Sequence, residues 1–190
     1  MAVRGREKFA KIKSLLNFIS KFYSLFPLKI RKILFEHHRG TKGLKGIAIR
    51  YALLKSIAKR CGDNVSIHPN CYIFFPEKLE IGDNVSIHPM CYIDAAGGLS
   101  IGNDVSIAHA VTIMTSSHRF DRHDIPIKDQ IFDVAKTEIG NDVWIGAKAT
   151  ILCGNNIGSG SVIGAGAIVT HNIQNNTINV GAPARAIKER

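Results

Sequence analysis

The residues best suited to chemistry are gathered in one irregular stretch, MTSSHRFDRHDIPIKDQIFDVAK, at positions 114–136. This stretch holds two histidines, His118 and His123, among arginines and aspartates. An imidazole accepts and releases protons near neutral pH, so either histidine suits general base catalysis. The sequence on both sides is periodic, and a long excursion from a regular fold is typical of a functional loop.

The elements that must position these histidines are built from a repeat. CGDNVSIHPNCYIFFPEKLE (61–80) is followed at once by IGDNVSIHPMCYIDAAGGLS (81–100), and IGNDVSIAHAVTI (101–113) starts a third copy. Farther along, aliphatic residues recur six apart, at 139, 145, 151, 157, 163 and 169. Units of this size bury their apolar faces only against their neighbours, so the sequence predicts a stacked solenoid.

Each six-residue unit starts with an aliphatic residue and has a small or β-branched residue at its fifth place. This spacing does not match a helix, whose apolar residues recur three and four apart. Gly, Asn and Asp lie between and tolerate the backbone of sharp corners, so three units predict one triangular coil. The first two copies are 20 residues apart. We therefore expect extra residues to bulge at one corner, near 76–79 and 96–99.

Charge divides the chain at about residue 60. Residues 1–60 hold 16 basic and 2 acidic side chains, a net charge of +14, whereas residues 61–190 hold 9 and 13, a net charge of −4. Apolar residues recur at helical spacing from Phe9 to Phe26, and Pro27 ends the run. We interpret residues 1–60 as a basic amphipathic helical segment that either only caps the solenoid or also contacts an anionic membrane.

The remaining composition narrows the class of protein. We expect no nucleic-acid partner, because no nucleic-acid-binding module is recognisable. No run of about eighteen apolar residues and no signal peptide is present, so we expect a cytoplasmic protein, with peripheral contact at the inner membrane face left open. The four cysteines, at positions 61, 71, 91 and 153, fit buried small apolar residues.

Three further motifs follow the histidine-bearing stretch, in the order EIGNDVWIGAKATIL, IGSGSVIGAGAIVT and GAPARAIK. With them, residues 61–190 resemble the hexapeptide-repeat acetyltransferases, in particular the maltose, galactoside and polysaccharide O-acetyltransferases. The resemblance implies a mainly β fold, a left-handed parallel β-helix with N-terminal helices and a short C-terminal helix. It also implies acetyl-CoA as donor, a sugar hydroxyl as acceptor, a role in surface polysaccharide or lipopolysaccharide biosynthesis, and a homotrimer with active sites between subunits.

The same resemblance suggests roles for individual residues. His118 matches the catalytic base, with His109 and His123 as competing candidates, and the backbone N–H of Ala147 would face the oxyanion of the intermediate. The residues expected to contact acetyl-CoA are Trp144, Ala147, Ala165, Thr170, His171, Arg185 and Lys188. His171 stands where the family often has lysine, which predicts weaker phosphate binding at neutral pH.

The acceptor site is less well defined, with His88, Asp94 and His123 as candidates. His68 repeats His88 one coil earlier, so both also fit a structural corner residue. The next residue in register is Ala108 and not His109, which argues against a zinc site of three histidines, and we expect no metal.

Three alternatives remain. Serine acetyltransferases often carry a DRH segment like Asp121–His123, which leaves serine open as the acceptor. An antibiotic acceptor would change only the molecule that receives the acetyl group. A non-catalytic solenoid that binds or assembles would bind no acetyl-CoA.

Overall fold

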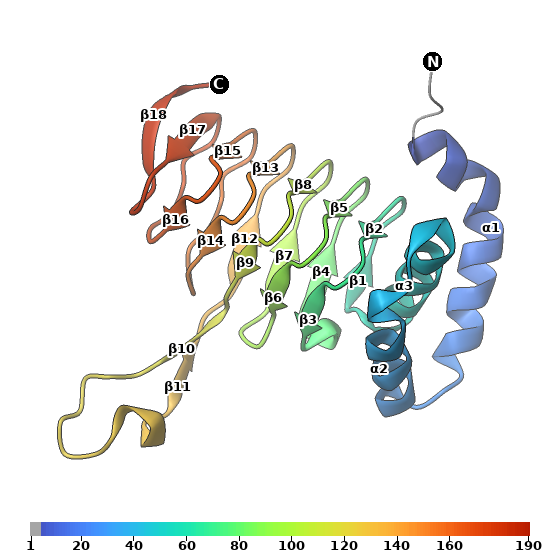
Figure 1. The fold of residues 1–190 in the computed structure, drawn as a ribbon, viewed down its shortest axis with the longest axis horizontal. Helices are drawn as coiled ribbons and strands as arrows, with labels where there is room; N and C mark the ends of the chain where they lie inside the picture. Colours follow the sequence, from blue (N-terminus) through green and yellow to red (C-terminus); the bar gives the residue numbers. More distant parts are fainter. Residues whose placement is uncertain (1–4) are drawn as a thin grey trace.

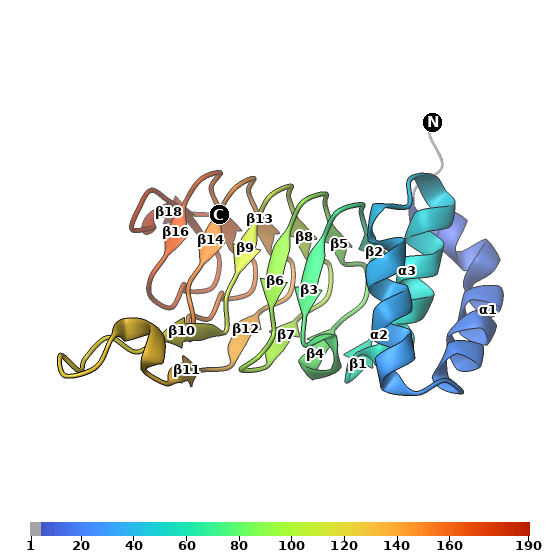
Figure 2. The same cartoon turned by 60° about the horizontal axis from the view of Figure 1, so that its bottom comes forward.

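The computed structural model describes residues 5–190, which form a parallel β-solenoid with helices at its N-terminal end (Figure 1, Figure 2). The short strands of successive coils pair in parallel and build three sheets, one on each face of the coil. The predicted mainly β solenoid with N-terminal helices is confirmed.

Strands of successive coils lie next to one another in each sheet, and the three sheets differ in their number of strands. The first sheet contains, in order, β1 (Arg60–Cys61), β4 (Leu79–Ile81), β7 (Leu99–Ile101) and β12 (Thr137–Ile139). The second contains β18 (Arg185–Glu189), β17 (Thr177–Val180), β15 (Val162–Ile163), β13 (Trp144–Ile145), β8 (Ser106–Ile107), β5 (Ser86–Ile87) and β2 (Ser66–Ile67). The third contains β16 (Ile168–Val169), β14 (Thr150–Ile151), β9 (Thr112–Ile113), β6 (Tyr92–Asp94) and β3 (Tyr72–Phe74).

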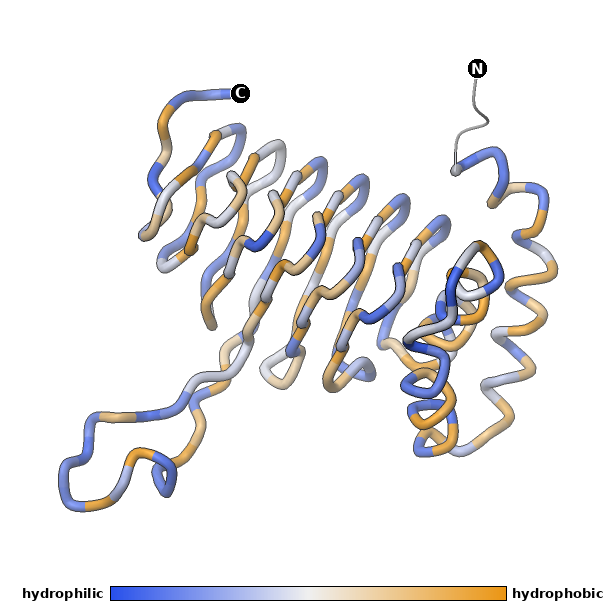
Figure 3. Tube along the Cα trace, in the orientation of Figure 1, coloured by the Kyte–Doolittle hydropathy of each residue, from blue (hydrophilic) through white to orange (hydrophobic). Residues whose placement is uncertain are grey.

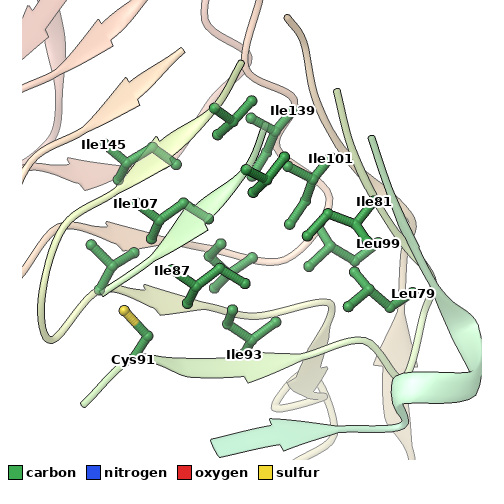
Figure 4. Close-up of a cluster of buried hydrophobic side chains, with 14 of the residues drawn as sticks. Leu79, Ile81, Ile87, Cys91, Ile93, Leu99, Ile101, Ile107, Ile139 and Ile145 are labelled. Carbon is green, nitrogen blue, oxygen red and sulfur yellow. The ribbon is translucent and has the colours of Figure 1, made fainter. Parts of the chain in front are cut away.

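The six-residue pattern places like residues above one another. In the second sheet the isoleucines of five coils align in register and are fully buried, at Ile67, Ile87, Ile107, Ile145 and Ile163. Hydrophilic residues return at the same corner of successive coils (Figure 3), while the isoleucines and leucines fill the interior (Figure 4). The core is therefore one continuous column, in which each coil is buried by its neighbours.

The corners take the backbone expected of Asn and Asp. Asn64, Asn84 and Asp104 have φ of 54°, 57° and 58°, in the left-handed region that these residues tolerate. Asn64 Nδ2 donates to Asn84 Oδ1 at 3.1 Å, and Asn84 Nδ2 donates to Asp104 Oδ1 at 3.1 Å. The side chains thus form a ladder along one edge of the solenoid.

The extra residues of the 20-residue copies bulge where we expected them. In the first copy they form the short 3-10 helix η2 (Pro76–Lys78). In the second copy a turn closes with Gly98 N donating to Ala95 O at 2.9 Å.

Three α-helices close the N-terminal end: α1 (Gly5–Ser24), α2 (Leu28–His37) and α3 (Gly43–Ile57), with a short 3-10 helix, η1 (His38–Gly40), before α3. Both views place α3 next to the first coil and α1 outermost (Figure 1, Figure 2). Lys13 of α1 and Lys55 of α3 bind Asp63 of the first coil at 2.6 and 3.0 Å. These hydrogen bonds lower the pKa of Asp63 below its ordinary value, and the bond from Lys13 has the largest effect.

A buried arginine fastens this helical layer to the solenoid. Arg50 of α3 is 1% exposed. Its Nε donates to Ile67 O at 2.9 Å, and its Nη1 donates to His38 O at 2.9 Å and to Thr41 O at 2.7 Å. One guanidinium therefore ties the first coil, η1 and the loop before α3 together.

The C-terminus corrects one expectation. The predicted short C-terminal helix is wrong, because Arg185–Glu189 form β18, which pairs antiparallel with β17. Pairing with β17 satisfies backbone groups and covers the edge of the last coil.

The histidine-bearing stretch leaves the solenoid as a hairpin. β9 ends at Ile113 and β12 begins at Thr137, so the stretch 114–136 lies between two regular strands. It contains β10 (Ser116–His118), a short 3-10 helix, η3 (Ile127–Asp129), and β11 (Phe132–Val134), which pairs antiparallel with β10. The hairpin and its tip project away from the coils (Figure 1, Figure 2). Within the described residues, no helix is long and apolar enough to cross a membrane.

Candidate active site

The candidate base lies at the root of the projecting hairpin. His118 is the last residue of β10, and its side chain is exposed. Its ring centre lies 4.1 Å from that of Phe132, its partner across the hairpin. One residue farther out, Arg119 Nε donates to Asp133 Oδ1 at 2.9 Å. The imidazole is thus supported by an aromatic ring and is accessible to a substrate.

A polar cluster, made of the buried Asp94 and Thr115 and the half-buried Ser116, holds the root of the hairpin. Asp94 is only 7% exposed, and its Oδ2 accepts from Ser116 Oγ at 2.5 Å while its Oδ1 accepts from Ala96 N at 2.9 Å. Thr115 Oγ1 donates to Asp94 O at 3.0 Å and accepts from Gly97 N at 2.8 Å. Both carboxylate oxygens of Asp94 therefore accept hydrogen bonds within the chain. One of the donors, Ser116, lies two residues before His118.

This cluster was not found from the sequence. Asp94 was predicted to contact the acceptor, and that contact stays a prediction, while Thr115 and Ser116 were given no role. The one available signal was the run of hydroxyl residues directly before His118.

The outer part of the hairpin is held by Gln130. Its side chain is buried, and its Nε2 donates to Arg122 O at 2.8 Å while its Oε1 accepts from Arg122 N at 3.2 Å. His123 follows Arg122 on this outer part and is exposed. The structure therefore places His123 on the projecting loop and His118 at its base.

The expected oxyanion donor lies just after β13. Gly146 N donates to Ile163 O at 2.7 Å and Lys148 N donates to His109 O at 3.0 Å, but the N–H of Ala147 between them has no acceptor among residues 5–190. The N–H of Ala165, one coil later, also has none within that range. Backbone amides without partners are suited to bind a ligand's oxygen. Trp144 stands on the outer face of the same strand and is 54% exposed.

Three of the residues expected to bind coenzyme A come together at the last coils. Arg185 Nη1 lies 3.3 Å from His171 Nδ1, and His171 Nδ1 lies 3.4 Å from Thr170 Oγ1. All three side chains are exposed. Lys188 lies farther along β18, opposite Ile178, and has no contact with this group among the residues described.

The acceptor candidate His88 is part of a histidine stack. The rings of His68 and His88 lie 4.9 Å apart and 11° from parallel. Burial, followed by the charges of His88 and Arg50, lowers the pKa of His68. The His109 backbone O lies on the next turn and accepts from Lys148 N. Within residues 5–190, no three histidine, cysteine, aspartate or glutamate side chains are grouped so as to hold a metal ion.

The candidate base and the candidate acetyl-CoA contacts lie apart within one chain. Among the described residues, no hydrogen bond or ring contact joins His118 to Trp144, Ala147 or Arg185. The hairpin also points away from the coils that carry them (Figure 1). A base on one projecting hairpin and amides on solenoid corners are arranged so that a neighbouring chain can bring them together.

The fold and this arrangement define a class, the β-solenoid proteins of the hexapeptide-repeat type. No protein-family model matches the chain. The galactoside O-acetyltransferase of Escherichia coli K12 is 34% identical over 140 residues, 74% of this chain and 68% of that protein. The solved structure of a galactoside acetyltransferase in complex with coenzyme A has a TM-score of 0.75 and 30% identity, covering 84% of this chain and 78% of that one. The chain belongs to the hexapeptide-repeat acetyltransferase family.

Other relatives match over a shorter part. A probable acetyltransferase of Mycobacterium tuberculosis is 45% identical over 73 residues, which are 38% of this chain and 24% of that protein. The chain thus matches about a quarter of the length of this relative.

Proposed function

We propose that this protein transfers an acetyl group from acetyl-CoA to a hydroxyl group of a sugar, with His118 as the general base. The observation that carries the proposal is the exposed imidazole of His118 on a hairpin held by buried polar contacts. The galactoside acetyltransferase relatives, one of them in complex with coenzyme A, support the donor and the class of acceptor.

The proposed reaction is a direct transfer within a ternary complex. His118 takes the proton of the sugar hydroxyl as its oxygen attacks the thioester carbonyl. The carbonyl oxygen becomes an oxyanion, which the partnerless N–H of Ala147 stabilises. The carbon–sulfur bond then breaks, the acetyl group stays on the sugar oxygen, and the thiolate of coenzyme A takes the proton from His118.

Three neighbouring chains would complete the sites. We propose a homotrimer in which the hairpin of one chain reaches the solenoid of the next. The separation of His118 from Ala147 within one chain supports this arrangement, and so does the projection of the hairpin (Figure 2). Trp144, Ala165 and the group formed by Thr170, His171 and Arg185 would then bind acetyl-CoA beside the neighbouring base.

We propose the biosynthesis of a surface polysaccharide or lipopolysaccharide as the setting, in the cytoplasm and at the inner face of the membrane. A sugar acceptor carried on a lipid would lie at that face. The basic N-terminal segment, with a net charge of +14, supports a location near an anionic surface.

The test is an acetyl-CoA turnover assay that measures free thiol over a panel of sugars and nucleotide sugars. We expect sugar-dependent release and a loss of about 10²- to 10⁴-fold in kcat for His118→Ala. His123→Ala is the comparison variant, because it removes the competing candidate histidine from the same hairpin, and we expect it to lower kcat less than His118→Ala does. Equal turnover in His118→Ala and the unaltered protein would remove His118 as the base.

The same assay separates the alternatives. Serine and an aminoglycoside or chloramphenicol belong in the panel, and release with one of these alone would change the acceptor class. A chain that binds no acetyl-CoA in calorimetry would be a non-catalytic solenoid.

A further inference from the structure

One surface of the helical layer is apolar and exposed. Apolar side chains of α1, α2 and the turn between them remain 37% to 80% exposed, at Ile12, Leu15, Phe18, Phe22, Leu25, Phe26, Leu28, Ile30 and Ile33. We refer to these nine residues as the cap face. Monomeric proteins rarely expose so many large apolar side chains together, and such a surface marks a binding site.

The cap face is not the side by which α1 packs. Of the 20 residues of α1, only Leu16 and Ser20 are buried. Leu15, Phe18 and Phe22 follow one another at spacings of three and four, which puts them on one stripe of α1, and Leu25 comes directly after the helix ends at Ser24. α1 therefore has two apolar stripes, one against α3 and one turned outward.

Lysines surround the outward stripe. Lys8, Lys11, Lys21 and Lys29 lie on α1 and α2, and none of them forms an ion pair with a carboxylate in the part of the chain that the structure describes. The basic residues that do pair from these helices, Arg6, Lys13 and Lys32, bind acids of the solenoid. The charge beside the cap face is thus available to an external anion.

The apolar surface continues inward beside α1. A groove of about 570 Å³ lies between α1, α3 and the first two coils. Phe9, Ile12 and Leu44 are among its lining residues, and Arg6 and Lys8 also line it. A hydrocarbon-lined recess with cations beside it suits an amphiphile with an anionic head.

The position of the cap face favours a flat partner. α1 is the outermost element at one end of the solenoid, while the hairpin with His118 projects from its flank (Figure 1, Figure 2). A partner at that end leaves the hairpin uncovered. A second copy fits less well, because self-contact would bring together two segments that each carry a charge of +14.

We propose that the cap face binds the surface of an anionic phospholipid bilayer, with the phenylalanines and leucines entering the headgroup boundary and the lysines contacting lipid phosphates. This docking deepens the location proposed above. It does not require the acetyl transfer, so either proposal can fail without the other.

The test is flotation of the full chain with vesicles. We expect binding to vesicles of phosphatidylglycerol and phosphatidylcholine at low salt, weaker binding at high salt, and little binding to phosphatidylcholine alone. Lys11→Glu with Lys21→Glu should lower the partition coefficient by at least about tenfold, since each lysine near the surface contributes roughly fivefold. Phe18→Ser with Phe22→Ser should lower it as well.

Two controls keep the result interpretable. Phe120→Ser removes an exposed phenylalanine outside the cap face and should leave binding unchanged. Thiol release and circular dichroism verify that each variant is folded. Equal binding to neutral and anionic vesicles would overturn the proposal. So would a cap-face variant that binds vesicles normally but changes the oligomeric state in light scattering, because the face would then be a contact between copies.

Discussion

Asp94 Oδ2 accepts a hydrogen bond of 2.5 Å from Ser116 Oγ, although 22 positions separate the two residues in the sequence. Asp94 ends β6, and Ser116 begins β10, the strand that ends at His118. The contact therefore fastens the projecting hairpin to the solenoid at a point two residues from the proposed base. We infer that Asp94 positions the hairpin, because both oxygens of its carboxylate accept hydrogen bonds within the chain.

Replacing Asp94 should therefore impair catalysis more than substrate binding. We expect Asp94→Ala to lower kcat by about 10- to 100-fold with little change in the KM for acetyl-CoA, because a small displacement of a catalytic group is costly. Asp94→Asn should restore most of the activity, since an amide still accepts from Ala96 N and the Ser116 hydroxyl can turn to accept from it. Steady-state kinetics of both variants measure this.

A different result would support the acceptor contact suggested by the sequence. In that case Asp94→Ala would raise the KM of the sugar and leave kcat unchanged. Urea unfolding of the same variants separates either result from a loss of folded protein.

Arg185→Ala should weaken the binding of acetyl-CoA. Arg185 lies beside His171 and Thr170 at the last coils, where its guanidinium can meet a phosphate. We expect the KM for acetyl-CoA to rise by about tenfold, and the KM of the unaltered protein to rise with salt. Lys188→Ala is the matched control, because Lys188 lies on the same strand away from this group. A larger effect of Lys188→Ala than of Arg185→Ala would contradict the assignment.

Arg50→Met should destabilise the protein strongly. The substitution removes the donor to the carbonyls of Ile67 and Thr41, whereas His38 O keeps its bond from Thr41 N. Each unsatisfied group costs about 1–3 kcal/mol, so we expect the free energy of unfolding to fall by at least about 2 kcal/mol. Urea titration measures the change, and Lys42→Met, at an exposed position of the neighbouring loop, should have a small effect. Equal losses in the two variants would argue against Arg50 as the link.

Stability should decrease on mild acidification because of His68. Its pKa lies below the ordinary value of 6.5 in the folded chain, chiefly through burial. Below about pH 6.5 the unfolded chain binds a proton that the folded chain does not, so the free energy of unfolding falls with pH until the folded pKa is reached. We expect a lower urea midpoint at pH 5.5 than at pH 7.5, and a smaller difference in His68→Asn. His123→Asn is the control and should leave the difference between the two urea midpoints unchanged. If the difference in His68→Asn is as large as in the unaltered protein, the acid sensitivity belongs to other groups.

Regular parts of the molecule follow from the sequence alone. Short patterns repeated along the chain predict four of these parts. They are the stacked isoleucines, the Asn and Asp corners, the bulge at residues 76–78 and the N-terminal helices. The motifs of the later coils also predicted the family to which the chain belongs. The sequence also placed the candidate base in the excursion, because an interruption is easy to see in a periodic chain.

The tertiary structure alone decided how the irregular parts are held. No local pattern encodes the bond between Asp94 and Ser116 or the contact between Arg185 and His171. The same is true of the N–H of Ala147, which has no acceptor among residues 5–190. The C-terminal residues became a strand because the edge of β17 offered backbone partners. Short sequence patterns determine that the chain folds into coils. Contacts between residues far apart in the sequence depend on which surfaces and strand edges the folded coils leave exposed.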